Sequence, residues 1–295
     1  MVKHGKRKTM TFADYLILAV LTLIAALMIY PIVNVLAVSL SSYYETLKTP
    51  WMVVPRSLTT EGYQAVMNNK AFWRSYFNSI LVTAGTTLIG LTVTALMAWP
   101  LARKELKCKG LFMGLAIFTM VFSAGTIPNY LNMRSLGLLD NLWALILPGA
   151  FTGFNCVIMI SFFRQLPYEL IESASIDGAS EPYIFARIVL PLSKPVLASI
   201  ALFLAVGAWN SYFGAQIYIR DRDLWPMAMY LKELLTEATA AMMDAGSDPG
   251  AVGSATNPKT IQYASIIIST VPIMCIYPFL QKYFAKGVML GSVKG

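Results

Sequence analysis

The sequence predicts an all-α, polytopic membrane protein with six transmembrane helices, on the evidence of its composition and its hydropathy pattern. Only 13% of the residues are charged, whereas 57% are hydrophobic and the mean hydropathy is +0.60. A soluble domain carries about a quarter charged residues, so the low charge indicates a lipid environment. Cutting the sequence at every charged residue leaves six long uncharged runs, each reaching the roughly 20 residues that a helix needs to cross a bilayer: 15–44, 75–102, 110–133, 141–163, 195–219 and 260–281.

These runs form one six-span transmembrane domain at 15–283, between an N-terminal tail at 1–14 and a C-terminal tail at 284–295. The first run follows a basic tail, and residues 37–39 loosely resemble a signal-peptide cleavage site. Its apolar core is far too long for a secretory signal. We therefore expect it to be a retained anchor.

The distribution of Lys and Arg predicts that both termini lie in the cytoplasm. With six spans both termini lie on one side, and that side carries 14 of the 23 basic residues. Cytoplasmic segments of membrane proteins are enriched in Lys and Arg. The acidic residues divide six to nine, so this side has a net charge of +8 and the opposite side a net charge of zero. The basic pI therefore reflects an unequal distribution of charge between the two sides of the membrane, and it does not indicate a nucleic-acid site.

Several classes of function lack the residues that they need. The three cysteines, Cys108, Cys156 and Cys275, have no metal or redox spacing, and we expect buried free thiols. The single histidine, His4, leaves no His-based metal site and no Ser–His pair for an enzyme. The uncharged runs contain no ionisable group of the kind that an ion-coupled transporter carries. A channel stays open as an alternative.

The segment 164–194, on the predicted cytoplasmic side, has the signals of a short helix-turn-helix. Pro167 begins a helix, and Gly178 permits the left-handed turn that ends it. Ser180 caps a second helix, which Pro191 breaks before the next span begins. This segment is the longest of the predicted cytoplasmic loops.

The segment 220–259, on the predicted external side, is the longest loop there. It begins with alternating charges, continues as a helix-like stretch at 227–243, and ends in a run rich in Gly, Ser, Ala and Pro. Such a run is typical of a flexible linker. An external loop of this length can also contact a delivered ligand or its carrier.

The cytoplasmic segment resembles the EAA loop of ABC importer permeases. It reads Glu-Ser-Ala, three residues, Gly, nine residues and Ile-Val-Leu-Pro, and the family pattern has Glu-Ala-Ala, Gly and Ile-x-Leu-Pro at the same spacing. Ser173 is the single departure, a small residue in place of another. The resemblance implies the type I ABC importer permease fold. It also implies an ATPase-coupling role for Glu172, Ser173, Ala174, Asp177, Gly178, Ile188, Leu190 and Pro191.

Two further features resemble the carbohydrate branch of these permeases, close to the smaller permease of maltose-type and complex-oligosaccharide importers. The fifth run contains Trp-Asn at 209–210, and the C-terminal Gly291, Ser292, Val293, Lys294 and Gly295 are similar to a Gly-Gly-Val-Lys-Gly tail that contacts the ATPases in that branch. The runner-up is a permease for a non-sugar nutrient such as an amino acid or peptide.

The resemblance implies a bacterial inner-membrane protein with several partners. These are a second, related permease chain, two ABC ATPase subunits, an external solute-binding protein and the lipid bilayer. The sequence contains no GxxxxGK[S/T] motif, so ATP and Mg are expected on the ATPases. We expect no enzymatic activity, no metal site and no cofactor in this chain.

Polar and aromatic side chains inside the uncharged runs are the candidates for the substrate pathway. Aromatic faces pack on sugar rings, while amides pair with hydroxyl groups that lose their water. Hydrogen bonds between helices and contacts at the membrane interface are equally common roles for such residues. The candidates are Asn129, Tyr130, Asn155, Trp209, Asn210 and Tyr212.

Overall fold

The computed structural model describes residues 11–49, 51–245 and 258–288, and every regular element in these ranges is a helix. The chain divides into two compact units, each with a hydrophobic core of its own. Unit 1 comprises Met1–Asn68 and Glu237–Ile268, and unit 2 comprises Asn69–Thr236 and Ser269–Gly295. Their boundaries pass through two helices, α14 (Met227–Ala245) and α15 (Pro258–Val288).

Unit 1 is built on α1 (Phe12–Ser39), which is apolar around its whole circumference. It is followed by α2 (Tyr43–Lys48) and α3 (Glu61–Met67). The most apolar 18-residue window of α1 is 0% buried, whereas a helix of a soluble protein hides one apolar face. Its 28 residues are enough to cross a bilayer, as predicted for the first run.

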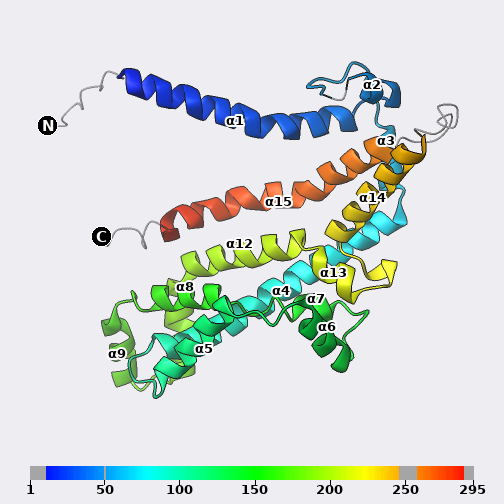
Figure 1. The fold of residues 1–295 in the computed structure, drawn as a ribbon. Coiled ribbons are helices and arrows are strands. Elements are labelled where there is room, and N and C mark those ends of the chain that lie inside the picture. Colours follow the sequence, from blue (N-terminus) through cyan, green and yellow to red (C-terminus); the bar gives the residue numbers. More distant parts are fainter. Residues whose placement is uncertain (1–10, 50, 246–257, 289–295) are drawn as a thin grey trace. The chain divides into compact units, whose positions relative to one another are not determined.

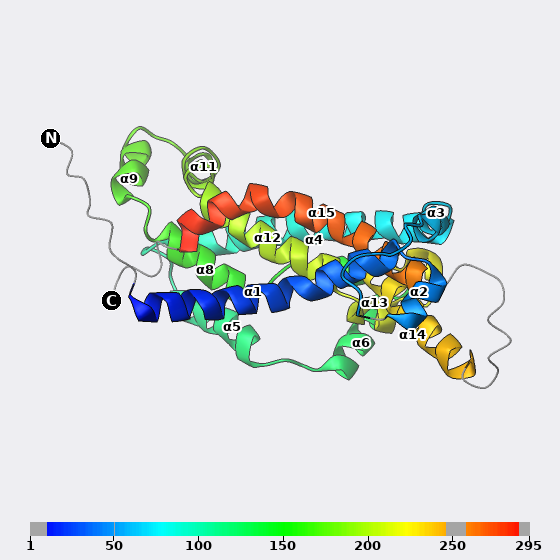
Figure 2. The ribbon, with the colours of Figure 1, turned by 90° about the horizontal axis from the view of Figure 1, so that it is seen from above.

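Unit 2 contains the other helices, drawn from cyan to yellow in Figure 1. The loop elements α9 to α11 lie at one end of this unit, and α6 and α13 lie at the opposite end (Figures 1 and 2). The helices are α4 (Lys70–Ala102), α5 (Lys109–Val121), α6 (Thr126–Ser135), α7 (Trp143–Ile146), α8 (Gly153–Phe163), α9 (Tyr168–Ile176), α10 (Glu181–Ile184), the π-helix η1 (Phe185–Val189), α11 (Leu190–Leu192), α12 (Lys194–Asn210), α13 (Phe213–Tyr218) and the 3-10 helix η2 (Arg222–Leu224).

The central helix of unit 2 is α4. The side chain of Asn69 caps its N-terminus by accepting hydrogen bonds from the backbone N–H of Ala71 at 2.9 Å and of Phe72 at 3.3 Å. Its 33 residues give a length of about 50 Å, so it is longer than a hydrocarbon core of about 30 Å. It packs mainly against α12 and α8. The approach is close at Gly90, where a Cβ would lie 2.8 Å from Leu204 Cδ1.

The core of unit 2 lies where α4, α8 and α12 meet the loop that contains α9. It is formed by apolar side chains from these three helices together with one residue of α9 and two of the α10–η1 segment. Trp99 of α4 packs edge-on against Phe163 of α8, with ring centres 6.1 Å apart. The same cluster therefore holds both the membrane helices and the loop.

Three of the predicted spans are interrupted, and the count of six helices is not confirmed among the described residues. Only α1, α4 and the apolar part of α15 are long, continuous and apolar enough to cross a membrane among the described residues, or up to five spans if each bent pair counts as one. The third run bends by 114° between α5 and α6. Gly125 is left-handed there, with φ +85°, and Pro128 falls in the first turn of α6, where no N–H partner is needed.

The fourth and fifth runs are interrupted as well. Pro148 and Gly149 lie between α7 and α8, whereas the break between α12 and α13 is at Ser211, which leaves the helical conformation without a proline or glycine at the break. Proline and glycine disfavour a helix interior. A run that is defined only by its lack of charged residues does not reveal where the helix breaks. The apolar pattern thus predicts how far each run extends, but it does not predict its breaks.

The segment 164–194, predicted to be cytoplasmic, is called the cytoplasmic segment below. Its second helix does not end at Pro191, contrary to the prediction. A π-helix at Phe185–Val189 leads into α11, so the chain stays helical through Leu192. The wider turns of a π-helix lie just before the proline, which has no N–H to donate. The chain instead bends by 79° at Ser193, before α12 begins. The side chain of Ser180 makes no capping hydrogen bond; its carbonyl accepts from Ile184 N at 3.0 Å.

The cysteines are free thiols, but two of them are not buried. Cys156 lies in the core of unit 2, whereas Cys108 and Cys275 are exposed. Cys156 and Cys275 lie inside apolar runs, which favoured burial, whereas Cys108 lies between Lys107 and Lys109. In a membrane protein, apolar residues also face lipid, so apolar neighbours do not imply burial inside the protein.

Candidate functional site

The turn at Gly178 gives the cytoplasmic segment a fixed shape. The N–H of Ala179 donates to the carbonyl of Ala174 at 2.9 Å, and the N–H of Gly178 donates to that of Ser175 at 3.1 Å. These two bonds define a Schellman motif, which closes a helix with one left-handed residue. Gly178 has φ +83° and no atom within 4 Å of its missing Cβ. Backbone conformation, and not lack of space, therefore requires glycine here.

One face of this segment is buried and the other is exposed. Ile171, Ile184 and Val189 belong to the core of unit 2. The opposite face carries Glu172, which is exposed, and Ile176, which is 79% exposed. This exposed face does not belong to the core of unit 2.

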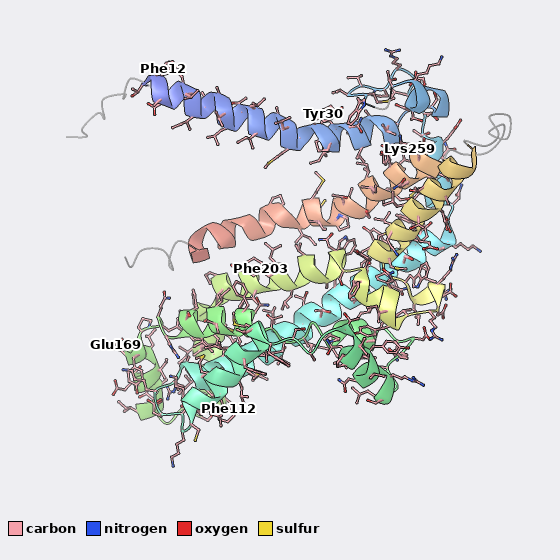
Figure 3. The ribbon with its side chains drawn as sticks, viewed as in Figure 1. Phe12, Tyr30, Phe112, Glu169, Phe203 and Lys259 are labelled. Atoms are coloured by element: carbon pink, nitrogen blue, oxygen red, sulfur yellow. The ribbon has the colours of Figure 1, made fainter. Side chains whose placement is uncertain are left out.

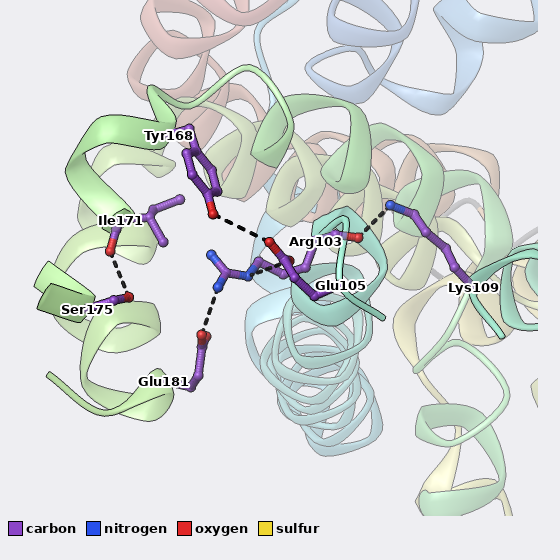
Figure 4. Close-up of polar contacts among 7 residues, drawn as sticks. All are labelled: Arg103, Glu105, Lys109, Tyr168, Ile171, Ser175 and Glu181. Carbon is purple, nitrogen blue, oxygen red and sulfur yellow. Dashed lines mark hydrogen bonds and ion pairs between the residues drawn. The ribbon is translucent and has the colours of Figure 1, made fainter. Parts of the chain in front are cut away.

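A polar network centred on Arg103 connects the segment to the C-terminal end of α4 (Figure 4). Arg103 Nη2 lies 2.9 Å from Glu181 Oε1, and its Nε lies 3.5 Å from Glu105 Oε2. The hydroxyl of Tyr168 donates to Glu105 Oε1 at 3.4 Å. The guanidinium also lies 5.3 Å from the centre of the Trp99 ring, within cation–π range. The network thus reaches both α9 and α10.

No motif in the sequence predicted this polar network. Arg103 and Glu181 are 78 residues apart, and the basic residues near Arg103 only indicated membrane orientation. The pKa of Glu105 is lowered by hydrogen bonding to backbone N–H groups and also by the charge of Arg103. Lys109 Nζ donates to the carbonyl of Arg103 at 2.6 Å, which ties the start of α5 to the same place.

A cavity of about 510 Å³ lies among α4, α7, α8, α12 and α13, and is called the interhelical cavity below. Its wall contains interrupted backbone, including Gly149 and Ser211, together with Asn155 and Phe203. Phe203 lies on α12 (Figure 3). Glu169 of α9, labelled in the same view, marks the end of the unit that carries the loop. Irregular backbone at membrane depth is tolerated where it lines a cavity or is buried in protein. The breaks in the fourth and fifth runs thus lie in the wall of this cavity.

The structure brings only one of the six predicted pathway residues into the wall of this cavity. Asn155 lines it and is 5% exposed. Trp209 packs edge-on against Tyr76 at 5.7 Å, and Asn210 Nδ2 donates within its own helix to Val206 O at 2.9 Å. Neither residue lines the interhelical cavity, so a pathway role for these two stays a prediction.

The other predicted pathway residues lie at the opposite end of unit 2 from α9. Asn129 is exposed on α6, and Tyr212 is exposed where α13 begins. Tyr130 stacks on Tyr218, with ring centres 6.4 Å apart and planes 12° apart. Tyr218 lines the interhelical cavity. Neither Phe203 nor Tyr218 was predicted, because apolar and aromatic residues are too common in spans to stand out.

The beginning of the predicted external loop is fixed to α4. Asn78 Nδ2 donates to the carbonyls of Asp223 at 2.8 Å and Trp225 at 3.2 Å. Ser79 Oγ accepts from Met227 N at 2.7 Å. The predicted helix at 227–243 is confirmed as α14. Residues 246–257 of this loop and the tail Gly291–Gly295 lie outside the described residues.

Comparison with known proteins agrees with this architecture. The family model described as "binding-protein-dependent transport system inner membrane component" matches residues 10–290. The chain belongs to this family. Its members are inner-membrane subunits of transport systems, so the helices described above are those of a multi-pass membrane permease with the type I permease fold.

Individual relatives match this chain over most of its length. The chain is 45% identical to the protein LplC of Bacillus subtilis (strain 168), over 92% of this chain and 91% of that protein. It is 39% identical to the polygalacturonan/rhamnogalacturonan transport system permease protein YtcP of the same organism, over 96% and 98%. A crystal structure of a bacterial ABC transporter involved in the import of the acidic polysaccharide alginate contains a similar chain. That match has a TM-score of 0.84 and 31% identity, and it covers 94% of this chain and 99% of that one.

Proposed function

We propose that this permease carries an oligosaccharide from an external solute-binding protein into the cytoplasm, driven by two ATPase subunits. It pairs with a second permease chain, and both of its termini are cytoplasmic. The sugar assignment follows the relatives, since YtcP is named for polygalacturonan and rhamnogalacturonan transport and another relative for arabinooligosaccharides. ATP and Mg bind to the ATPases, and this chain supplies the path.

The observation that carries the proposal is the rigid cytoplasmic segment. A loop that transmits movement must not absorb it, and two helices joined by a Schellman turn at Gly178 and held to the core by Ile171 and Ile184 meet that need. The exposed face of the same segment presents Glu172 to a partner. Glu172, Ser173, Ala174, Asp177, Gly178, Ile188, Leu190 and Pro191 form the proposed coupling surface.

The substrate path passes the interhelical cavity and the tyrosines at its predicted external side. Asn155 and Phe203 line this cavity, so an amide and an aromatic ring are available for hydroxyl groups and for a sugar face. The tail Gly291–Gly295 is proposed to contact the ATPases, by the resemblance of its sequence. The loop at 220–259 is proposed to contact the solute-binding protein.

Replacing Gly178 and Glu172 tests the coupling surface. Gly178→Val forces a branched residue into a left-handed conformation, at a cost of about 1 to 2 kcal/mol, and should weaken ATPase binding about five- to thirtyfold. The matched control is Gly137→Val. Gly137 has φ +68° with nothing near its missing Cβ, and it ends α6 with the same pair of hydrogen bonds. Retention of the ATPase during purification is the measurement.

Glu172→Ala is compared with Glu169→Ala on the same helix. If Glu172 only complemented the helix dipole, Glu169, which lies in the first turn, would matter at least as much. We expect Glu172→Ala alone to lower hydrolysis that is stimulated by loaded binding protein. Reconstituted complex is assayed with neutral and acidic oligosaccharides, amino acids and dipeptides. Stimulation by amino acids or dipeptides alone would contradict the sugar assignment, and equal effects of the two variants would contradict the role of Glu172.

A further inference from the structure

A second cavity, of about 280 Å³, lies at the end of unit 2 that carries α6 and α13. Its wall is formed by Tyr130 and Arg134 of α6, Asp140 of the following link, and Tyr218 and Arg220 at the end of α13. We call it the arginine pocket. Its volume is near the lower limit of about 300 Å³ for ligand sites, so it fits one part of a ligand and not a long chain.

The arginine pocket has a net positive wall. Asp140 is its single acidic residue, and its Oδ1 accepts from the backbone N–H of Arg220 and, at 3.2 Å, of Asp221. These backbone hydrogen bonds lower the pKa of Asp140. The carboxylate therefore stays ionised and hydrogen-bonded to the backbone. The wall therefore contains two positively charged guanidinium groups, those of Arg134 and Arg220, and one carboxylate.

The two arginines of the pocket are not in ion pairs within the described part of the chain. Other charges nearby are paired: Arg74 contacts Asp223, and Arg222 contacts Glu233. Arg134 and Arg220 have no acidic atom within ion-pair distance among the described residues. A guanidinium group matches a carboxylate with two parallel hydrogen bonds. The chemistry of this wall thus favours an anionic ligand.

The other wall of the arginine pocket is aromatic. The rings of Tyr130 and Tyr218 are nearly parallel, with planes 12° apart, and each ring carries a hydroxyl group. A flat apolar face beside hydroxyl groups suits a pyranose ring. Tyr218 also lines the interhelical cavity, so a ligand in the arginine pocket lies next to the proposed path.

We propose that the arginine pocket is a subsite for a uronic-acid unit, in which Arg134 and Arg220 bind the sugar carboxylate and Tyr130 and Tyr218 contact the ring. This rests on the proposed carbohydrate function and narrows its substrate class to acidic oligosaccharides. The subsite precedes the interhelical cavity on the way into the cell.

Direct binding tests the subsite without the selectivity of the solute-binding protein. The complex of the two permeases and the two ATPases is placed in nanodiscs without the solute-binding protein. It is titrated by calorimetry with trigalacturonate and with the fully methyl-esterified form of this sugar. The two probes have the same rings, but only the first has carboxylates. Trigalacturonate should bind about tenfold more tightly than the ester, because charged hydrogen bonds to arginine are lost with the ester. Raising the salt concentration should reduce this ratio.

Arginine variants assign the selectivity to the pocket. Arg134→Gln and Arg220→Gln should each bring the ratio of the two dissociation constants close to one. Arg134→Lys keeps the charge but not the planar fork, so it should retain part of the preference. The matched control is Arg56→Gln, which removes an exposed arginine outside the pocket and should keep the ratio. Thermal unfolding shows that each variant is folded.

The outcomes separate the subsite from the proposed function. Equal binding of both probes to the unmodified complex overturns the subsite and leaves carbohydrate transport standing. Full selectivity in both Arg134→Gln and Arg220→Gln also overturns it, because the carboxylate is then bound elsewhere. Absence of binding by either probe, together with no stimulation by any oligosaccharide in the hydrolysis assay, contradicts the proposed function itself.

Discussion

At the scale of single residues, Arg103 shows how one side chain positions a loop. It lies just beyond the end of α4, 20% exposed, between a carboxylate of α10 and the ring of Trp99. Its partner Glu181 is 54% exposed, so water weakens the ion pair. The arginine therefore contributes more to the direction of the loop than to the stability of the fold.

Arg103→Gln should loosen the cytoplasmic segment without unfolding unit 2. Loss of one partly exposed ion pair and one cation–π contact costs about 1 kcal/mol, which is about a fivefold increase in local opening. Hydrogen exchange of residues 168–184 should rise by that factor, and Arg103→Lys should give a smaller rise. The control is Lys104→Gln, which removes a neighbouring exposed charge. Unchanged exchange in Arg103→Gln would show that the core alone fixes the loop.

At the scale of elements, the ends of α4 hold the two segments on which the proposed function depends. Its C-terminal end meets the cytoplasmic segment through Arg103. Near its N-terminal end, Asn78 and Ser79 hold the segment from Asp223 to Met227 by three hydrogen bonds. One continuous helix of 33 residues therefore connects both places rigidly, since a helix transmits displacement along its axis.

Asn78→Leu should release the beginning of the external loop. Asn78 is 6% exposed, and the substitution keeps the volume but leaves two carbonyls without a donor, at about 1 to 3 kcal/mol. We expect faster hydrogen exchange at residues 224–230 and unchanged exchange along α4. Thr92→Val serves as the control, because the hydroxyl of Thr92 donates to the carbonyl of Leu88 within α4. If residues 224–230 exchange at the same rate in both variants, Asn78 does not fix the loop.

At the scale of the whole molecule, the charge distribution predicts one orientation of the protein in the membrane. The predicted cytoplasmic side has a net charge of +8, and the other side a net charge of zero. The potential across the membrane and the anionic cytoplasmic leaflet favour this arrangement. The cytoplasmic segment and the arginine pocket lie at opposite ends of unit 2 (Figure 1), so a single orientation places each on the side that its proposed role needs.

Single-cysteine labelling tests this orientation. In a background without Cys108, Cys156 and Cys275, Lys109→Cys and Ser292→Cys should react with an impermeant reagent only from the cytoplasmic side. Ser247→Cys should react only from outside. Cytoplasmic labelling of position 247 would reverse the orientation and remove the arginine pocket from the entry side. Intact cells compared with inverted vesicles provide the measurement.

The sequence by itself determined the features that depend on composition and on short-range backbone chemistry. Low charge and long uncharged runs were enough to predict an all-helical membrane protein, because lipid tolerates few charges and no unpaired backbone. The turn at Gly178 was equally predictable, since a glycine after a helical stretch closes it through bonds to residues only a few positions away. The helix at 227–243 was predicted on the same local grounds.

Only the tertiary structure decided how the runs break and which side chains meet. The interruption at Pro148 and Gly149, between α7 and α8, is a local feature, but the cavity beside it is also bounded by three other helices, α4, α12 and α13. Arg103 meets Glu181, and Tyr130 meets Tyr218, across long stretches of chain. The surroundings of the predicted pathway residues also come from the tertiary structure, which places Asn155 in the wall of the interhelical cavity and Trp209 against Tyr76 of α4. Hydropathy specifies which residues leave water, whereas packing specifies their partners.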